Sequence, residues 1–143
     1  MKKQYGKYIL LCLITIIVLG YILYYNLKQE EPSILTKYIN EIKYNNINNF
    51  VIENSHVVIY ATNNTKNINF ENDLKKIIVK YNIGEKVLYY KNINYKDIKS
   101  KPYNKTNILV FYKNNKIKQT ISTKNLTYNN LLELLKENEI INE

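Results

Sequence analysis

His56-Val57-Val58-Ile59-Tyr60-Ala61 is a run of β-branched and aromatic residues without the polar alternation of a half-exposed strand. Such a run is typical of a strand that is buried on both faces of a sheet. A polar loop at 62–67 follows this strand. The next segment begins after the loop and ends at Asn82 and Gly84, which are typical of helix C-termini. Between them, apolar side chains recur at helical spacing at Phe70, Leu74, Ile77, Ile78 and Tyr81. The sequence therefore predicts a buried strand followed by an amphipathic helix.

The segments after this helix predict the rest of an α/β domain. Val87–Tyr90 is a second strand, which we expect to run parallel to the first after a right-handed crossover. Ile108–Tyr112 and Ile117–Ser122 are two further strands, joined into a hairpin by the turn at 113–116, where Asn tolerates positive φ. Thr127 is placed to cap a final helix. The apolar face of that helix consists of Tyr128, Leu131, Leu132 and Leu135, with Ile140 beyond.

A further helix is predicted before the central strand. Ser33 is a suitable N-cap, and the Asn-rich stretch 45–49 is where the helical pattern fades. The apolar residues at helical spacing are Ile34, Leu35, Tyr38, Ile39 and Ile42. Phe50–Ile52 is expected to be a separate short apolar piece.

The N-terminal stretch Tyr8–Tyr25 carries no charge, and 11 of its residues are Ile, Leu or Val. Eighteen helical residues span roughly 27 Å, against a hydrocarbon core of about 30 Å. Tyrosines stand at both ends, as in the aromatic belt of a membrane protein. A cleaved signal peptide is the alternative, but the apolar run is long and no small-x-small cleavage site follows it. We expect an uncleaved anchor in a lipid bilayer.

Charges beside the span predict its orientation. Three lysines precede it, whereas Lys28 is followed by Glu30 and Glu31. The excess of lysine places the N-terminus in the cytoplasm and the C-terminal domain outside a cell membrane that the chain crosses once. The expected organisation is a cytoplasmic N-terminus at 1–7, an anchor at 8–27, a juxtamembrane linker and helix at 28–48, and an extracytoplasmic domain at 49–143.

The composition is rich in Lys and Asn and lacks Arg and Trp, a bias typical of AT-rich genomes. From Pro32 onward there are 17 lysines and 10 acidic residues, a net charge near +7. This charge would suit anionic lipid or a cell-wall polymer, but compositional bias explains it better. Because the lysines are scattered and do not alternate with aromatic residues, we expect no nucleic-acid partner.

The predicted order of strand, helix, strand, hairpin and C-terminal helix resembles the outline of a thioredoxin-like domain. Val57–Ala61 resembles the central strand that leads into the active-site loop of that family. Leu109–Ile117 resembles the family's apolar strand, its turn and the start of the next strand. The chain looks most like small membrane-anchored thioredoxin-like proteins of low-GC Gram-positive bacteria, including those labelled bacteriocin transport accessory proteins. The resemblance covers roughly Asn49 to Asn138.

The family's redox chemistry does not carry over to this chain. The two cysteines of the family's Cys-x-x-Cys site fall near Asn64 and Asn67, and the only cysteine is Cys12 in the apolar span. Disulfide exchange needs a thiolate, which an amide cannot supply. Thr106-Asn107 stands where the family has a cis-proline, and Pro102 comes too early in the chain. We therefore expect a non-redox member of this fold.

Other catalytic or metal chemistry has little support in the residues. The only histidine, His56, lies next to Ser55 and leads into the central strand, so we expect it to have no catalytic role. One histidine and scattered carboxylates offer no metal-ligand spacing. The chain has three glycines and no Gly-rich phosphate loop. We expect no cofactor, no metal and no enzymatic activity.

In thioredoxin-like folds, extended peptides bind at the edge formed by the loop after the central strand and the segment before the third strand. The resemblance therefore implies a protein- or peptide-binding site at that edge. Its residues would be Thr62, Asn63, Asn64, Thr65, Asn67, Thr106 and Asn107. The expected function is an extracytoplasmic protein-binding or accessory module. The alternatives are a thiol-less subunit beside an active disulfide oxidoreductase, and a non-thiol enzyme of unknown class.

Overall fold

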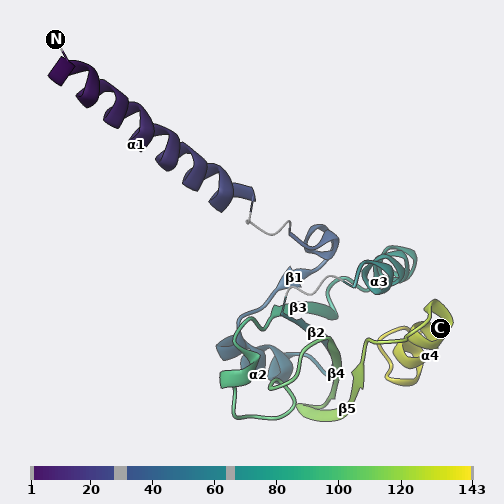
Figure 1. Cartoon of the computed structure of the whole chain (residues 1–143). Helices are drawn as coiled ribbons and strands as arrows, with labels where there is room; N and C mark the ends of the chain where they lie inside the picture. Colours follow the sequence, from purple (N-terminus) through teal and green to yellow (C-terminus); the bar gives the residue numbers. More distant parts are fainter. Residues whose placement is uncertain (1, 28–31, 64–66, 143) are drawn as a thin grey trace. The chain divides into compact units, whose positions relative to one another are not determined.

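The computed structural model describes residues 2–27, 32–63 and 67–142 (Figure 1). The chain forms two compact units, Met1–Glu31 and Pro32–Glu143. The described residues of the first unit form the helix α1 (Lys2–Leu27), of which Lys3–Leu27 is long and apolar enough to cross a membrane. The predicted apolar helix is therefore confirmed, and it begins several residues before Tyr8.

The second unit is built on a five-stranded mixed sheet with the strand order β1-β3-β2-β4-β5. Strand β2 lies in the middle, parallel to β3 and antiparallel to β4, while β1 is parallel to β3 and β5 is antiparallel to β4. The predicted central strand is confirmed, since six of its seven residues are buried. The strands are β1 (Asn40–Glu41), β2 (His56–Thr62), β3 (Val87–Lys91), β4 (Ile108–Lys113) and β5 (Lys116–Ser122).

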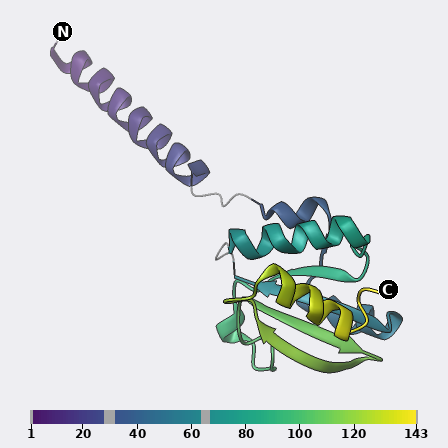
Figure 2. The ribbon, with the colours of Figure 1, turned by 90° about the vertical axis from the view of Figure 1, so that its right-hand side faces the viewer.

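Helices cover both faces of this sheet. Figure 2 shows α3 and α4 on one face, with α2 on the other. The helical segments are η1 (Ile34–Lys37), α2 (Tyr44–Glu53), α3 (Ile68–Tyr81), η2 (Tyr95–Asp97) and α4 (Tyr128–Glu137); η1 and η2 are 3-10 helices. The arrangement is a three-layer α/β/α domain with mixed strand directions.

Two hydrophobic clusters lie on the two faces because successive residues of a strand point to opposite sides. On the α3–α4 face, Val58 and Tyr60 of β2 pack with Leu35 of η1 and with apolar residues of α3 and α4. On the α2 face, Val57, Ile59 and Ala61 of β2 pack with Ile47 and Val51. The unbroken apolar run of β2 therefore serves both clusters.

The helix predicted to begin after Ser33 and to fade at 45–49 is wrong. Ser33 does act as a cap, since its Oγ accepts a hydrogen bond from the Leu35 amide at 3.2 Å, but the 3-10 helix that it caps ends at Lys37. The chain then forms the short edge strand β1. The Asn-rich stretch lies inside α2, which also contains Phe50–Ile52. The expected boundary between 48 and 49 thus falls within a helix, and the compact unit begins at Pro32.

The apolar spacing before the central strand misled this prediction for a physical reason. Leu35 and Ile39 are buried by a 3-10 helix and a turn, and Ile42 is held by a hydrogen bond from its amide to the Tyr89 carbonyl at 2.8 Å. Three successive local structures therefore bury residues at intervals that resemble a helical period. Helix α2 buries only Ile47 and Val51, at i and i+4, and four of its ten residues are asparagines.

The predicted turns are confirmed where asparagine adopts left-handed backbone. Asn114 and Asn115 have φ of 49° and 66° in the two-residue connection between β4 and β5. Positive φ at both positions matches the twist of a hairpin. Asn82 ends α3 with φ of 52°, as expected of a left-handed cap.

Candidate functional site

The predicted binding residues lie at the end of β2 and before β4. Asn64 and Thr65 fall outside the described residues. Asn67 is the N-cap of α3, and its Oδ1 accepts a hydrogen bond from the Phe70 amide at 3.3 Å. The four remaining residues, Thr62, Asn63, Thr106 and Asn107, are brought together by hydrogen bonds.

Two of these bonds connect the end of β2 to the segment before β4. The Thr62 hydroxyl donates to Asn107 Oδ1 at 2.8 Å, and the Asn63 amide donates to Thr106 Oγ1 at 2.7 Å. Asn107 has φ of 55°, a conformation that asparagine adopts more readily than most residues. The two segments are thereby held beside each other where β2 ends and β4 begins.

Two further polar residues complete this network and were missed from the sequence. Asn92, directly after β3, is 1% exposed; its amide donates to the Thr62 carbonyl at 2.8 Å, and its Nδ2 donates to the Lys105 carbonyl at 2.7 Å. Thr123, after β5, is also buried, and its amide and hydroxyl donate to the Asn107 carbonyl at 2.9 and 3.1 Å. Their position immediately after predicted strands was the available signal. We call Thr62, Asn63, Asn92, Thr106, Asn107 and Thr123 the polar edge.

The hydrogen bonds of the polar edge determine what it can contact. Thr62 is 1% exposed, so its side chain is part of the domain's own framework. Asn63, Thr106 and Asn107 are half-buried. Because buried polar groups need partners, this network fixes the shape of the edge. A ligand would meet a polar surface whose half-buried residues are Asn63, Thr106 and Asn107.

Two large apolar side chains flank the polar edge in the chain and are open to solvent. Ile68, next to the Asn67 cap, and Ile93, next to Asn92, are each 59% exposed. Both therefore lie near the same end of the central strands. Single exposed isoleucines are common, but two at the same end of the sheet as a hydrogen-bonded polar network are suited to contact with another protein.

His56 takes part in a separate cluster at the opposite end of β2. Its Nε2 lies 2.8 Å from Glu139 Oε2, at ion-pair distance but without hydrogen-bond alignment, and Ser55 Oγ lies 3.1 Å from its Nδ1. Lys113 Nζ lies 2.7 Å from Glu139 Oε1, and this hydrogen bond and charge hold the pKa of Glu139 below its usual range. The cluster links the segment after α4 to the ends of β2 and β4.

No group of three His, Cys, Asp or Glu side chains that could hold a metal ion occurs within 2–27, 32–63 and 67–142. The one cysteine, Cys12, lies in α1. The polar edge therefore consists of amide, hydroxyl and backbone groups, which recognise ligands by hydrogen bonds.

Comparison with known proteins adds no functional assignment. No protein-family model matches the chain, and no curated protein matches it.

Proposed function

We propose that this protein is a membrane-anchored, non-redox, thioredoxin-like module that binds a protein partner outside the cell. The observation that carries the proposal is the pair of exposed isoleucines, Ile68 and Ile93, beside the hydrogen-bonded polar edge. Peptide groups of a partner would bond to the half-buried polar groups, and apolar side chains would pack on the isoleucines.

The topology of the second unit supports the thioredoxin-like part of the proposal. The parallel β2–α3–β3 unit, the β4–β5 hairpin and the final helix α4 follow the expected order. On this proposal, the polar edge corresponds to the part of that fold beside its active-site loop. Asn67, at one expected cysteine position, is the N-cap of α3, so an amide replaces a thiol at the helix N-terminus.

The apolar helix α1 supports the membrane part of the proposal. With the lysines on its N-terminal side, the expected orientation has the N-terminus in the cytoplasm and the second unit outside. Tethering confines the module to the surface where other membrane proteins lie. The effective concentration toward such partners is then high, so that weak contacts at a small edge are sufficient.

Site-specific photo-crosslinking in cells tests this function. A photoreactive amino acid replaces Ile68 or Ile93 in the full-length chain, and membrane-extracted adducts are identified by mass spectrometry. We expect one protein to be captured from both positions, because both lie near the same edge. The matched controls are Ile52 and Val79, which are 64% and 58% exposed and lie on α2 and toward the end of α3.

The controls decide the result, since all four positions present an apolar side chain of similar exposure. Capture from Ile68 and Ile93 but not from Ile52 and Val79 supports binding at the polar edge. The same diffuse set of adducts from all four positions, or none from any, contradicts the proposal.

A further inference from the structure

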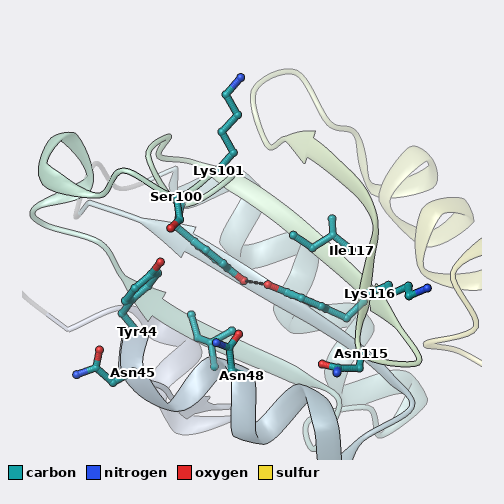
Figure 3. Close-up of a pocket in the computed structure, with 11 residues that line it drawn as sticks. Tyr44, Asn45, Asn48, Ser100, Lys101, Asn115, Lys116 and Ile117 are labelled. Carbon is teal, nitrogen blue, oxygen red and sulfur yellow. Dashed lines mark hydrogen bonds between the residues drawn. The ribbon is translucent and has the colours of Figure 1, made fainter.

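A cavity of about 590 Å³ opens on the α2 face, in a part of the domain distinct from the polar edge (Figure 3). Its walls come from the first half of α2, the loop at 100–103, the end of β4, the β4–β5 turn and the start of β5. These segments are far apart in the sequence and are brought together only by the fold. The volume lies within the range of about 300–1,000 Å³ that is usual for small-molecule sites.

A pair of buried phenols is central to this cavity. The hydroxyls of Tyr103 and Tyr112 lie 2.6 Å apart, and the two side chains are 4% and 7% exposed. Figure 3 draws this hydrogen bond as a dashed line. Burial raises the pKa of Tyr103 and of Tyr112 above the usual range, so both stay protonated at neutral pH. The hydrogen bond between the two hydroxyl groups takes the proton of only one of them. The proton of the other hydroxyl can be donated to another acceptor.

An aromatic ring stands beside the phenol pair. Tyr44 is 38% exposed and lines the cavity, and its ring centroid lies 5.9 Å from that of Tyr103 in an edge-to-face arrangement. The Tyr90 ring lies 6.1 Å from Tyr44 and 5.5 Å from Tyr103. Since the three rings support one another, Tyr44 is held as a fixed apolar wall.

The polar lining is made mostly of uncharged groups that both donate and accept hydrogen bonds. Asn45 and Asn48 are exposed on α2, Asn115 lies in the hairpin turn, and Ser100 comes from the loop. In Figure 3, Ser100 and Asn48 lie on opposite sides of the phenol pair. A carboxamide can donate and accept at the same time, which matches the vicinal hydroxyls of a sugar.

The charged residues of the lining do not point into the cavity. Lys101 and Lys116 are exposed, and Figure 3 shows their side chains extending outward. None of the described residues that line the cavity is acidic. A neutral ligand therefore fits these walls better than an anion, whose charge would need a cation directed at it.

From these observations we infer that the cavity binds a polyhydroxylated, uncharged ligand of the carbohydrate type. Amide, hydroxyl and phenol groups would bond the sugar hydroxyls, while Tyr44 would pack against the apolar face of a ring. This combination of an aromatic wall and a few directed polar groups is the general design of a small-molecule site. The inference does not rest on protein binding at the polar edge.

Titration of the full-length chain in detergent micelles tests this inference. The probes are maltotriose, cellotriose and triacetylchitotriose, and the readout is the ¹³C-methyl NMR signal of Ile117, which lines the cavity. We expect a saturable shift with at least one trisaccharide. Asn48→Ala should raise its Kd about tenfold, the equivalent of losing roughly 1.4 kcal/mol.

The matched control is Asn49→Ala, which makes the same change at the next position of α2. Asn49 is exposed and is not among the residues that line the cavity, so its Kd should stay within about twofold of the unmodified chain. The absence of a saturable shift with all three probes would overturn the inference. Equal weakening by Asn48→Ala and Asn49→Ala would also overturn it.

A second pair of variants separates sugar binding from anion binding. Lys101→Ala and Lys116→Ala, combined, should change the Kd by less than about twofold, since neither ammonium group points inward. Loss of binding in this double variant with retention in Asn48→Ala would make the cavity an anion site and would contradict the inference.

Discussion

The two faces of the central sheet bury tyrosine hydroxyls in different ways. On the α3–α4 face, the Tyr60 hydroxyl donates to Glu71 Oε1 at 3.3 Å, and Ser33 Oγ donates to Oε2 of the same carboxylate at 3.0 Å. On the α2 face, Tyr103 and Tyr112 bond to each other. Glu71 is supplied by α3, the helix that covers its face, whereas both phenols come from the loop before β4 and from β4 itself.

This difference follows from how much helix covers each face. The α3–α4 face is packed by η1, α3 and α4, and its polar pair lies beneath them. The α2 face is packed by one short helix, which buries Ile47 and Val51, and by Ile98 and Tyr103 of the segment before β4. This cover leaves part of the face open, and the cavity lies beside the first half of α2. The helices on the α3–α4 face therefore cover it and stabilise the fold, whereas the incomplete cover of the α2 face leaves room for a ligand.

An isoleucine-to-alanine substitution on each face should change the free energy of unfolding most. Ile77→Ala on α3 and Ile47→Ala on α2 remove side chains that are 0% and 2% exposed. We expect losses of about 4 kcal/mol and about 2 kcal/mol in the free energy of unfolding, within the usual range for such changes. The smaller loss is expected at Ile47 because this side chain lines the cavity, whereas Ile77 lies within the cluster packed by η1, α3 and α4.

Urea unfolding of the full chain in micelles, followed by circular dichroism, measures both values. Equal losses for Ile77→Ala and Ile47→Ala would show that the two faces are packed alike and would contradict this expectation.

Tyr112→Phe should have the next largest effect. It leaves the buried Tyr103 hydroxyl without its partner, which costs about 1–3 kcal/mol. Adding Tyr103→Phe removes the orphaned hydroxyl, so the double variant should lose less than the sum of the two single variants. A double-mutant cycle by urea unfolding measures this coupling. Additive losses would mean that the phenols do not stabilise each other.

Alkaline pH tests both faces together. Burial raises the folded-state pKa of Tyr60, Tyr103 and Tyr112 above the usual value of about 10. The unfolded chain then loses these protons first as the pH rises. The contribution of each tyrosine is fully present below pH 10 and falls above it, by at most about 1.4 kcal/mol per pH unit.

The slope can be assigned to one face by substitution. Between pH 10 and 11, the free energy of unfolding should fall less in Tyr60→Phe than in the unmodified chain, because one buried tyrosine is missing. Urea unfolding at both pH values measures this difference. A free energy of unfolding with the same slope in the unmodified chain and in Tyr60→Phe would contradict the burial of this hydroxyl.

The strands around β2 could be predicted because their signals are local. The apolar run of His56–Ala61, the helical spacing of α3 and the Asn-Asn turn each determine a structure within a few residues. The structure of Ile34–Ile42 could not be predicted, because its apolar residues are buried by contacts with β3 and α3 that no local pattern reveals.

The candidate sites divide in the same way. Thr62 and Asn107 could be placed together from the fold outline, since both flank neighbouring strands. The cavity could not be predicted, because it joins Tyr44 to Tyr103 and Asn115 across more than fifty residues. The abundance of Asn and Tyr in this chain also hides which of them line a site.

The smallest expected effect on stability concerns Asn48, and it separates ligand binding from folding on the α2 face. Asn48 is exposed in a helix interior, where alanine is the better helix former by up to about 0.7 kcal/mol. Asn48→Ala should therefore raise the free energy of unfolding by a few tenths of a kcal/mol, and Asn49→Ala should do the same. Urea unfolding of both variants checks this, and a loss above about 1 kcal/mol from Asn48→Ala alone would mean that the amide supports the fold. If both variants are slightly stabilised while only Asn48→Ala weakens sugar binding, Asn48 acts in recognition, and the incomplete cover of the α2 face is what makes the site.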